Sequence, residues 1–268
     1  KVLQVAEELN FSVSRSAVAL KRGQTFRIAL LAGGHIDWFS ARILEGLNSV
    51  LHDTGYDFSI YAITHDEERA RFFEQLPVRR NADAIIVSSF NLSPDETDRL
   101  HAMGIPIVGI NVASPGEFDA SIGIDDTTAI QILVRHLVAL GHRRIAYLYE
   151  ESISPLRFSS YQRVAGFTQL CDELDGVAGT AIAVRHGDDC ANVAITTLLS
   201  QPDPPTAICV HQDSWAIPLF FRLPRYGIRI PDDLSIVGFD DSDFAAEAGL
   251  TTIRQRPREM AQLAARMA

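Results

Sequence analysis

The sequence predicts an α/β protein made of two lobes, each a doubly wound parallel sheet of the Rossmann type. From Phe26 onward, short β-branched and apolar runs alternate with longer helical patterns. The short runs are continuously apolar, which is typical of parallel strands covered by helices on both faces. Eight such units also fit a closed (β/α)8 barrel. An irregular stretch at residues 112–126 breaks the alternation and favours a crossover between two sheets.

The first 25 residues differ from the rest. Residues 2–9 carry apolar side chains on one helical face, and Asn10 ends that pattern. Ser12 or Ser14 can cap a short second helix, RSAVALK, and residues 22–25 then form a linker. A helix of about seven residues is marginal in water. We therefore expect this second helix to form only against a partner.

Eight strands are expected in the remainder of the chain. They lie at residues 27–31, 58–63, 84–89, 105–110, 144–149, 181–184, 206–210 and 234–239.

Helical patterns lie between these strands. Residues 39–52 keep an apolar stripe of 3.6-residue period, and Gly55 follows where a C-terminal cap is expected. Another helix begins near Thr127, and a second crossover is expected near residues 250–255. Because ligands of open α/β sheets bind at the carboxyl ends of the strands, we expect a ligand between the two lobes.

The composition is that of an ordinary soluble globular protein: 268 residues, 47% apolar and 22% charged. No apolar run approaches the roughly 18 residues of a membrane span, and the N-terminus has no signal-peptide pattern. The three cysteines are far apart and form no CxxC pair. These features predict a cytoplasmic protein with no membrane partner, disulfide framework or zinc knuckle.

Charge is distributed unevenly along the chain. The net charge of −10 argues against a nucleic-acid binder when the chain is taken as a whole. Residues 1–27, however, hold five basic and two acidic residues, a net charge of +3, which leaves −13 for the rest. A short basic head therefore precedes a strongly acidic body.

No strong enzyme motif is present. The sequence lacks a GK[ST] phosphate loop, a GxGxxG after a strand, a GxSxG elbow and an HExxH pair. The eight histidines show no metal-ligand spacing. We expect no catalysis, no metal and no cofactor.

Three carboxylates follow the strand at 234–239. Asp240 ends that strand, so its side chain is expected to face the space between the lobes, with Asp241 and Asp243 close behind. A cation would need several converging oxygens, and a structural cap or salt bridge is a further possibility. Arg163 begins the corresponding edge of the same lobe, and an arginine held by a carboxylate can bind a polar ligand without metal. We favour the ligand role.

Three other aspartates precede predicted helices. Asp125 and Asp126 stand before the helix that begins near Thr127, and Asp213 follows the strand at 206–210. Aspartate is a preferred N-cap residue, so capping is the role expected of all three.

Four segments carry a family resemblance. They are IGIDDTTAIQILVRHLVALGHRRIAYL (122–148), SSYQRVAGF (159–167), RIPDDLSIVGFDDSDFA (229–245) and LTTIRQ (250–255). In this order and spacing they resemble the lactose/galactose repressor (LacI/GalR) family of bacterial transcription regulators. Residues 2–25 resemble the last helix of that family's DNA-binding headpiece and its hinge helix.

The resemblance covers essentially all 268 residues. The family's other headpiece helices would precede Lys1, and the family continues beyond Ala268 into at least one more strand.

The resemblance implies a periplasmic-binding-protein-like core, in which two Rossmann-like lobes joined by three crossovers close on a small effector. That effector is usually a sugar and sometimes a purine or nucleoside. The resemblance also implies a repressor that binds operator DNA and assembles as a homodimer or tetramer. Residues 1–25 would be the headpiece remnant, hinge helix and linker. Residues 26–124 with 252–268 would form the N-terminal lobe, and residues 125–251 the C-terminal lobe.

Site residues are implied position by position. In the N-terminal lobe the effector would meet Trp38, Phe39 and Asn111, although Trp38 and Phe39 could equally be core residues. In the C-terminal lobe the residues implied are Arg157, Arg163, Gln212 and Asp240. In the hinge they are Arg15, Ala17, Leu20 and Lys21, with Leu20 as the wedge that enters the minor groove. Asp241 and Asp243 would stabilise the turn or helix that follows Asp240.

Two other functions share this architecture. A solute-binding protein for sugar uptake needs no DNA but needs export, and its basic head would have no role. A sugar-processing α/β enzyme would need a nucleophile or an acid–base pair, and the motifs supply neither.

Overall fold

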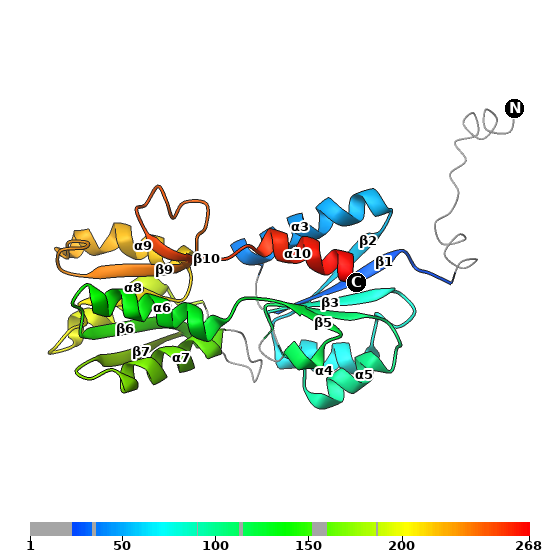
Figure 1. The fold of residues 1–268 in the computed structure, drawn as a ribbon, viewed down its shortest axis with the longest axis horizontal. Helices are drawn as coiled ribbons and strands as arrows, with labels where there is room; N and C mark the ends of the chain where they lie inside the picture. Colours follow the sequence, from blue (N-terminus) through cyan, green and yellow to red (C-terminus); the bar gives the residue numbers. More distant parts are fainter. Residues whose placement is uncertain (1–22, 34–35, 90, 113–114, 152–159, 186) are drawn as a thin grey trace, which may run out of the picture.

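Two five-stranded parallel sheets, one in each lobe, form the molecule, and the lobes lie side by side along its long axis (Figure 1). The computed structural model describes residues 23–33, 36–89, 91–112, 115–151, 160–185 and 187–268. The predicted hinge contacts Arg15, Ala17, Leu20 and Lys21 lie outside the described residues, as does Arg157.

The first sheet belongs to the N-terminal lobe and has the order β2-β1-β3-β4-β5. Its strands are β1 (Arg27–Gly33), β2 (Asp57–Ile63), β3 (Ala84–Ser88), β4 (Ile107–Ile110) and β5 (Ala120–Ile122). A short 3-10 helix, η1 (Pro115–Glu117), precedes β5.

Helices cover both faces of this sheet. They are α3 (Trp38–Thr54) and α10 (Pro257–Met267) on one face, and α4 (Asp66–Gln75) and α5 (Pro94–His101) on the other (Figure 1). Successive residues of β1 point to opposite faces, so Leu30 packs with the α3–α10 side and Leu31 with the α4–α5 side. The predicted cap is confirmed: Gly55 has φ 77°, and its N–H bonds to the Leu51 carbonyl.

The second sheet belongs to the C-terminal lobe and has the order β10-β9-β8-β6-β7. Its strands are β6 (Arg144–Glu151), β7 (Ala178–Arg185), β8 (Ala207–Val210), β9 (Ser235–Asp240) and β10 (Thr251–Arg254). The helices are α6 (Asp126–Ala139) and α7 (Ser160–Glu173) on one face, α8 (Cys190–Ser200) and α9 (Asp213–Arg222) on the other, and the 3-10 helix η2 (Leu223–Tyr226) after α9.

The predicted fold of two parallel-sheet lobes is confirmed, with two strands more than expected. The stretch at 112–126, expected to be irregular, holds η1 and β5, and the segment at 250–255 forms β10. Both added strands lie at sheet edges and are only three and four residues long, too short to give an apolar run. The edge strand β7 is mostly exposed, so it is not covered on both faces as the sequence suggested.

The chain passes between the lobes where the strands end. It leaves β5 and reaches α6 in the second lobe, and it returns after β10 to α10, which packs against α3 (Figure 1). Because β10 pairs with β9, residues 251–254 belong to the second sheet. Among the described residues, no helix is both long and apolar enough to cross a membrane.

Candidate functional site

Asp240 is the last residue of β9, and only 7% of it is exposed. Its carboxylate accepts a hydrogen bond of 2.7 Å from Gln255 Nε2, and its backbone carbonyl accepts one of 2.9 Å from the Gln255 N–H. Its φ of 125° is rare for a residue with a side chain, a kind of strain that persists where surrounding contacts impose it. Burial raises the pKa of Asp240 to about 7.

Arg163 lies on α7 and is 4% exposed. Its Nε donates to Asp126 Oδ1 at 2.7 Å, and its Nη1 donates to the His211 carbonyl at 3.0 Å. The guanidinium also stacks on the Phe239 ring, 3.6 Å from the centroid. The positive charge of Arg163 opposes the rise in the pKa of Asp240, which places the two groups within electrostatic range.

The two aspartates before α6 have different roles. Asp125 caps the helix, since its side chain accepts from the Thr128 N–H at 2.9 Å, as predicted. The capping role predicted for Asp126 is wrong. Asp126 is the first residue of α6, it is 2% exposed, and its carboxylate binds the Arg163 guanidinium.

Asp213 is completely buried and does not cap α9, contrary to the prediction; Gln212 occupies the cap position. The Asp213 carboxylate accepts from the Ser242 N–H at 2.8 Å and from Thr252 Oγ1 at 2.7 Å. Burial raises its pKa. Asp213 therefore ties the turn after β9, which carries Asp240, to β10.

Gln212 and His211 lie at the end of β8. Gln212 is half-buried, and its Nε2 donates to Ser214 Oγ at 2.7 Å. The Nδ1 atom of His211 is buried, and burial together with the nearby Arg163 lowers the pKa of this histidine to about 3. The imidazole is neutral at physiological pH, so it adds no charge beside Arg163.

The N-terminal lobe contributes the start of α3 and the end of β4. Asp37 caps α3 by accepting from the Ser40 N–H at 2.9 Å. Trp38, the first residue of α3, is half-buried, whereas Phe39 is 8% exposed and packs in the core of its lobe. Asn111 directly follows β4, is 4% exposed and has a left-handed φ of 50°.

An ion pair joins the two lobes. Arg42 Nη2, on α3, donates to both carboxylate oxygens of Asp243, at 2.5 and 2.7 Å. Asp243, predicted to stabilise the turn or helix that follows Asp240, thus also reaches the other lobe. The negative charge of Asp37 also contributes to the raised pKa of Asp240, which brings the start of α3 within electrostatic range of the end of β9. Asp241 instead pairs with Arg254 of its own sheet, at 2.5 Å.

The comparisons with known proteins agree with this architecture. Residues 134–268 match the family described as the periplasmic binding protein-like domain. The chain belongs to this family.

Relatives of this family member are transcriptional repressors. The HTH-type transcriptional repressor CytR of Escherichia coli (strain K12) is 26% identical over 260 residues, which cover 95% of this chain and 75% of CytR. The HTH-type transcriptional repressor PurR of Vibrio atlanticus (strain LGP32) is 27% identical over 267 residues, covering 97% and 78%.

Solved structures share the fold. A LacI family transcriptional regulator from Bifidobacterium animalis subsp. lactis has a TM-score of 0.77 at 26% identity, with 91% of this chain and 88% of that chain covered. The lac repressor dimer bound to operator and the anti-inducer ONPF has a TM-score of 0.81 at 24% identity, covering 99% and 81%. The resemblance to the LacI/GalR family that the sequence motifs indicate is confirmed.

Sequence reasoning missed three polar residues of the candidate site at the lobe junction: Asp126, His211 and Gln255. Each directly follows or nearly follows a strand that ends at the lobe junction: β5, β8 and β10. Their position after a strand could have identified them, because the same position identified Asp240 as a candidate ligand contact. Asp126 was assigned a capping role, His211 directly follows β8 but belongs to no motif, and β10 itself was not predicted.

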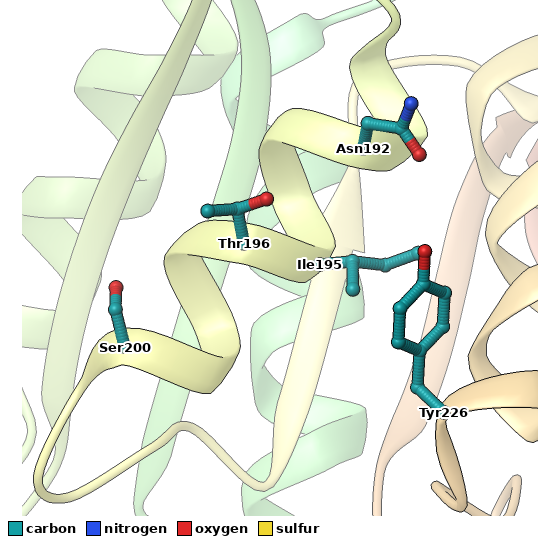
Figure 2. A pocket seen from close by; sticks show the side chains of 5 residues that line it. All are labelled: Asn192, Ile195, Thr196, Ser200 and Tyr226. Carbon is teal, nitrogen blue, oxygen red and sulfur yellow. The ribbon is translucent and has the colours of Figure 1, made fainter.

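A separate hollow of about 510 Å³ lies on the second lobe beside α8 (Figure 2). Its lining residues are Asn192, Ile195, Thr196, Ser200 and Tyr226. None of them is charged, and none is a predicted effector contact. Within the described part of the chain, no three His, Cys, Asp or Glu side chains converge as a metal site.

Asp240 predicts a pH dependence of folding stability. Its pKa is about 7 in the folded protein against 3.8 for a free side chain. Its stabilising contribution is therefore fully present below about pH 4 and is lost as the pH rises to about 7, because over this range only the unfolded chain releases the proton. We expect the free energy of unfolding of wild type, minus that of Asp240→Asn, to fall over this window by up to about 1.4 kcal/mol per pH unit. Urea unfolding at several pH values measures it, and a flat difference would contradict the raised pKa.

Proposed function

We propose that this protein is an effector-responsive, DNA-binding transcriptional repressor that works in the cytoplasm as a homodimer. The repressors CytR and PurR, similar over nearly all of this chain, support the regulatory role. The similar lac repressor structure is a dimer bound to operator, which supports the same assembly and partner here. The basic residues Arg15, Lys21 and Arg22 suit the DNA backbone.

The observation that carries the effector role is the buried polar set at the lobe junction. Arg163 is fixed by Asp126 and stacked on Phe239, and Asp240 is fixed by Gln255. Fixed donors and acceptors of this kind bind a polar ligand without first being ordered. Trp38, Asn111 and Gln212 would complete the effector contacts. Phe39 would support them from the core.

The ligand class follows from the chemistry of the same residues. A carboxyl group accepts hydrogen bonds from hydroxyls or ring N–H groups, and an arginine donates to hydroxyl or carbonyl oxygens. An indole ring offers a flat apolar face on which a sugar or base can stack. We infer that the effector is a sugar or a nucleobase or nucleoside, bound without a metal or cofactor.

Regulation would follow from unequal binding to two lobe arrangements. A ligand shifts an equilibrium only by the difference in its affinity for the two states. The Arg42–Asp243 pair joins the lobes at one side of the site, so a ligand that alters the lobe separation would make or break it. The change would pass to the residues that precede Thr25 and so to DNA.

A thermal-shift screen tests the effector site. We expect a sugar or nucleoside to raise the melting temperature, because binding to the folded state adds RT ln(1 + [L]/Kd) to its stability. Asp240→Ala should then weaken binding of that ligand by about 2–4 kcal/mol, the scale of removing one partner from a buried charged hydrogen bond. Isothermal titration calorimetry on both proteins gives this difference.

Asp232→Ala is the matched control, since Asp232 lies in the same segment as Asp240 but is exposed. It should bind the ligand as wild type does. Equal affinity of Asp240→Ala and wild type would remove Asp240 from the site. Conversion of the ligand to a product that requires Asp240 would favour an enzyme instead. If the protein binds the ligand but has no affinity for DNA, a solute-binding protein is favoured instead.

A further inference from the structure

The start of the core is held by a single carboxylate. Asp83 lies just before β3, and both of its oxygens bind residues that precede β1. Oδ1 accepts from the Thr25 N–H at 2.8 Å and from Thr25 Oγ1 at 2.9 Å, and Oδ2 accepts from the Phe26 N–H at 2.9 Å. Three hydrogen bonds to one side chain therefore fix the last linker residue, Thr25, and the first residue of the lobe, Phe26.

Thr25 lies outside the sheet ladder, and Phe26 meets it through its carbonyl, which accepts from the Asp57 N–H. Pairing of β1 with β2 begins at Arg27, opposite Asp57, and pairing with β3 begins one residue later. Fixing Thr25 is therefore not needed to build the sheet, which already holds Arg27. The contacts of Asp83 extend the rigid part of the lobe by two residues toward the N-terminus.

Phe26 shows how firmly this junction is fixed. Its φ is 52°, in the left-handed region that side-chain-bearing residues seldom adopt. Such a conformation persists where surrounding contacts over-determine it. Here those contacts are Asp83, the Asp57 N–H that donates to the Phe26 carbonyl at 3.0 Å, and the Tyr56 ring, 5.6 Å from the Phe26 ring.

We propose that Asp83 is the anchor through which the N-terminal lobe positions the DNA-binding segment that precedes it. The inference rests on the proposed function, since it needs a DNA-binding segment before Thr25. Asp83 acts as a positioning residue and contacts neither effector nor DNA. With the anchor made, only Gly23 and Gln24 separate the rigid lobe from residue 22. A change in the position of the lobe then moves the DNA-binding segment as well.

Without the anchor, Thr25 would lose both of its bonds to the lobe and Phe26 would lose the one that its N–H makes. The two DNA-binding segments of a dimer would then sample more separations. A longer flexible connection lets each segment reach more positions, so its effective concentration at any one position falls. DNA half-site spacing mirrors the geometry of the protein dimer. Loss of the anchor should therefore relax the preference for one spacing, whereas a general loss of stability would weaken binding at every spacing alike.

The experiment uses the full-length protein. The wild type first selects a preferred DNA duplex from a pool of random sequences. Affinities are measured for that duplex and for derivatives with one or two base pairs added or removed between the half-sites. We expect Asp83→Ala to reduce the ratio of affinities between the selected and altered spacings by about tenfold or more, as expected for a longer flexible connection. Hydrogen exchange at Thr25 and Phe26 should become faster in the same variant.

Two milder variants keep the test valid if Asp83→Ala folds poorly. Asp83→Asn keeps one acceptor oxygen, and Thr25→Val removes one of the three hydrogen bonds, so both should give intermediate ratios. Asp98→Ala, at an exposed position on α5, is the control and should behave as wild type. An unchanged spacing ratio in variants whose Thr25 and Phe26 amides exchange faster would overturn the anchor. A wild type that selects no duplex would instead refute the proposed function.

Discussion

Arg163→Ala should lower the free energy of unfolding by about 3–5 kcal/mol, the cost of leaving one partner of a buried ion pair uncompensated. The side chains of Arg163 and Asp126 are 5% and 2% exposed, so water cannot replace the lost guanidinium. The variant also removes the donor to the His211 carbonyl and the cation stacked on Phe239. Urea unfolding followed by circular dichroism measures the change.

The matched control is Arg42→Ala, which removes ion pairs to Asp243 and Glu45; the Arg42 side chain is 32% exposed and those of its partners are 52% and 51% exposed. Exposed pairs contribute at most about 1 kcal/mol because water and salt screen them. The double variant Arg163→Met with Asp126→Asn should recover part of the loss, since it removes both buried charges together. If Arg163→Ala is no less stable than Arg42→Ala, the Arg163–Asp126 pair does not hold this part of the lobe.

Gly238→Ala has the second largest expected effect, a loss of about 2–4 kcal/mol in the free energy of unfolding from overpacking and a displaced buried carboxylate. A β-carbon at Gly238 would overlap Asp213 Oδ1 and lie 2.9 Å from Leu250 Cδ2. The Asp213 carboxylate would have to move, and its bonds to Ser242 and Thr252 would be lost. Thermal and urea unfolding measure the loss.

Gly116→Ala is the control for this substitution, because a β-carbon there meets nothing within 4 Å. It should change stability by less than about 0.5 kcal/mol, as for most surface substitutions. Because Asp213 fixes the turn that begins at Asp240, Gly238→Ala should also weaken binding of the proposed effector. A Gly238→Ala protein as stable as wild type would mean that the Asp213 carboxylate can move without cost.

The strand pattern could be predicted because buried parallel strands leave continuous apolar runs. The central strands β1, β3, β8 and β9 were found in this way, as burial on both faces leaves few polar residues in them. The strand β10 was not predicted, because its four residues, TTIR, are exposed or half-buried and form no continuous apolar run. The position of Asp240 at the end of β9 also followed from the pattern.

The partner of Arg163 could not be predicted from local sequence. Asp126 stands 37 residues away, and two aspartates before a helix indicate capping. The pairing depends on how closely α6 and α7 approach. Gly166 makes that approach possible, because a β-carbon there would lie 3.0 Å from Ile130 Cγ2. The direction of the Asp126 side chain is thus decided by helix packing, which no short motif records.

The packing of α10 on α3 determines the order in which the lobes can be completed during synthesis. By Arg254 the ribosome has supplied all five strands of the second sheet, and domains generally fold as units while the chain emerges. At that point α3, with Ile43 and Leu47, still lacks α10, whose Met260 and Ala261 belong to the same buried cluster in the folded lobe. The apolar surface of α3 stays open to chaperones or to other nascent chains until α10 has emerged. The lobe that is begun first is therefore the one that is finished last.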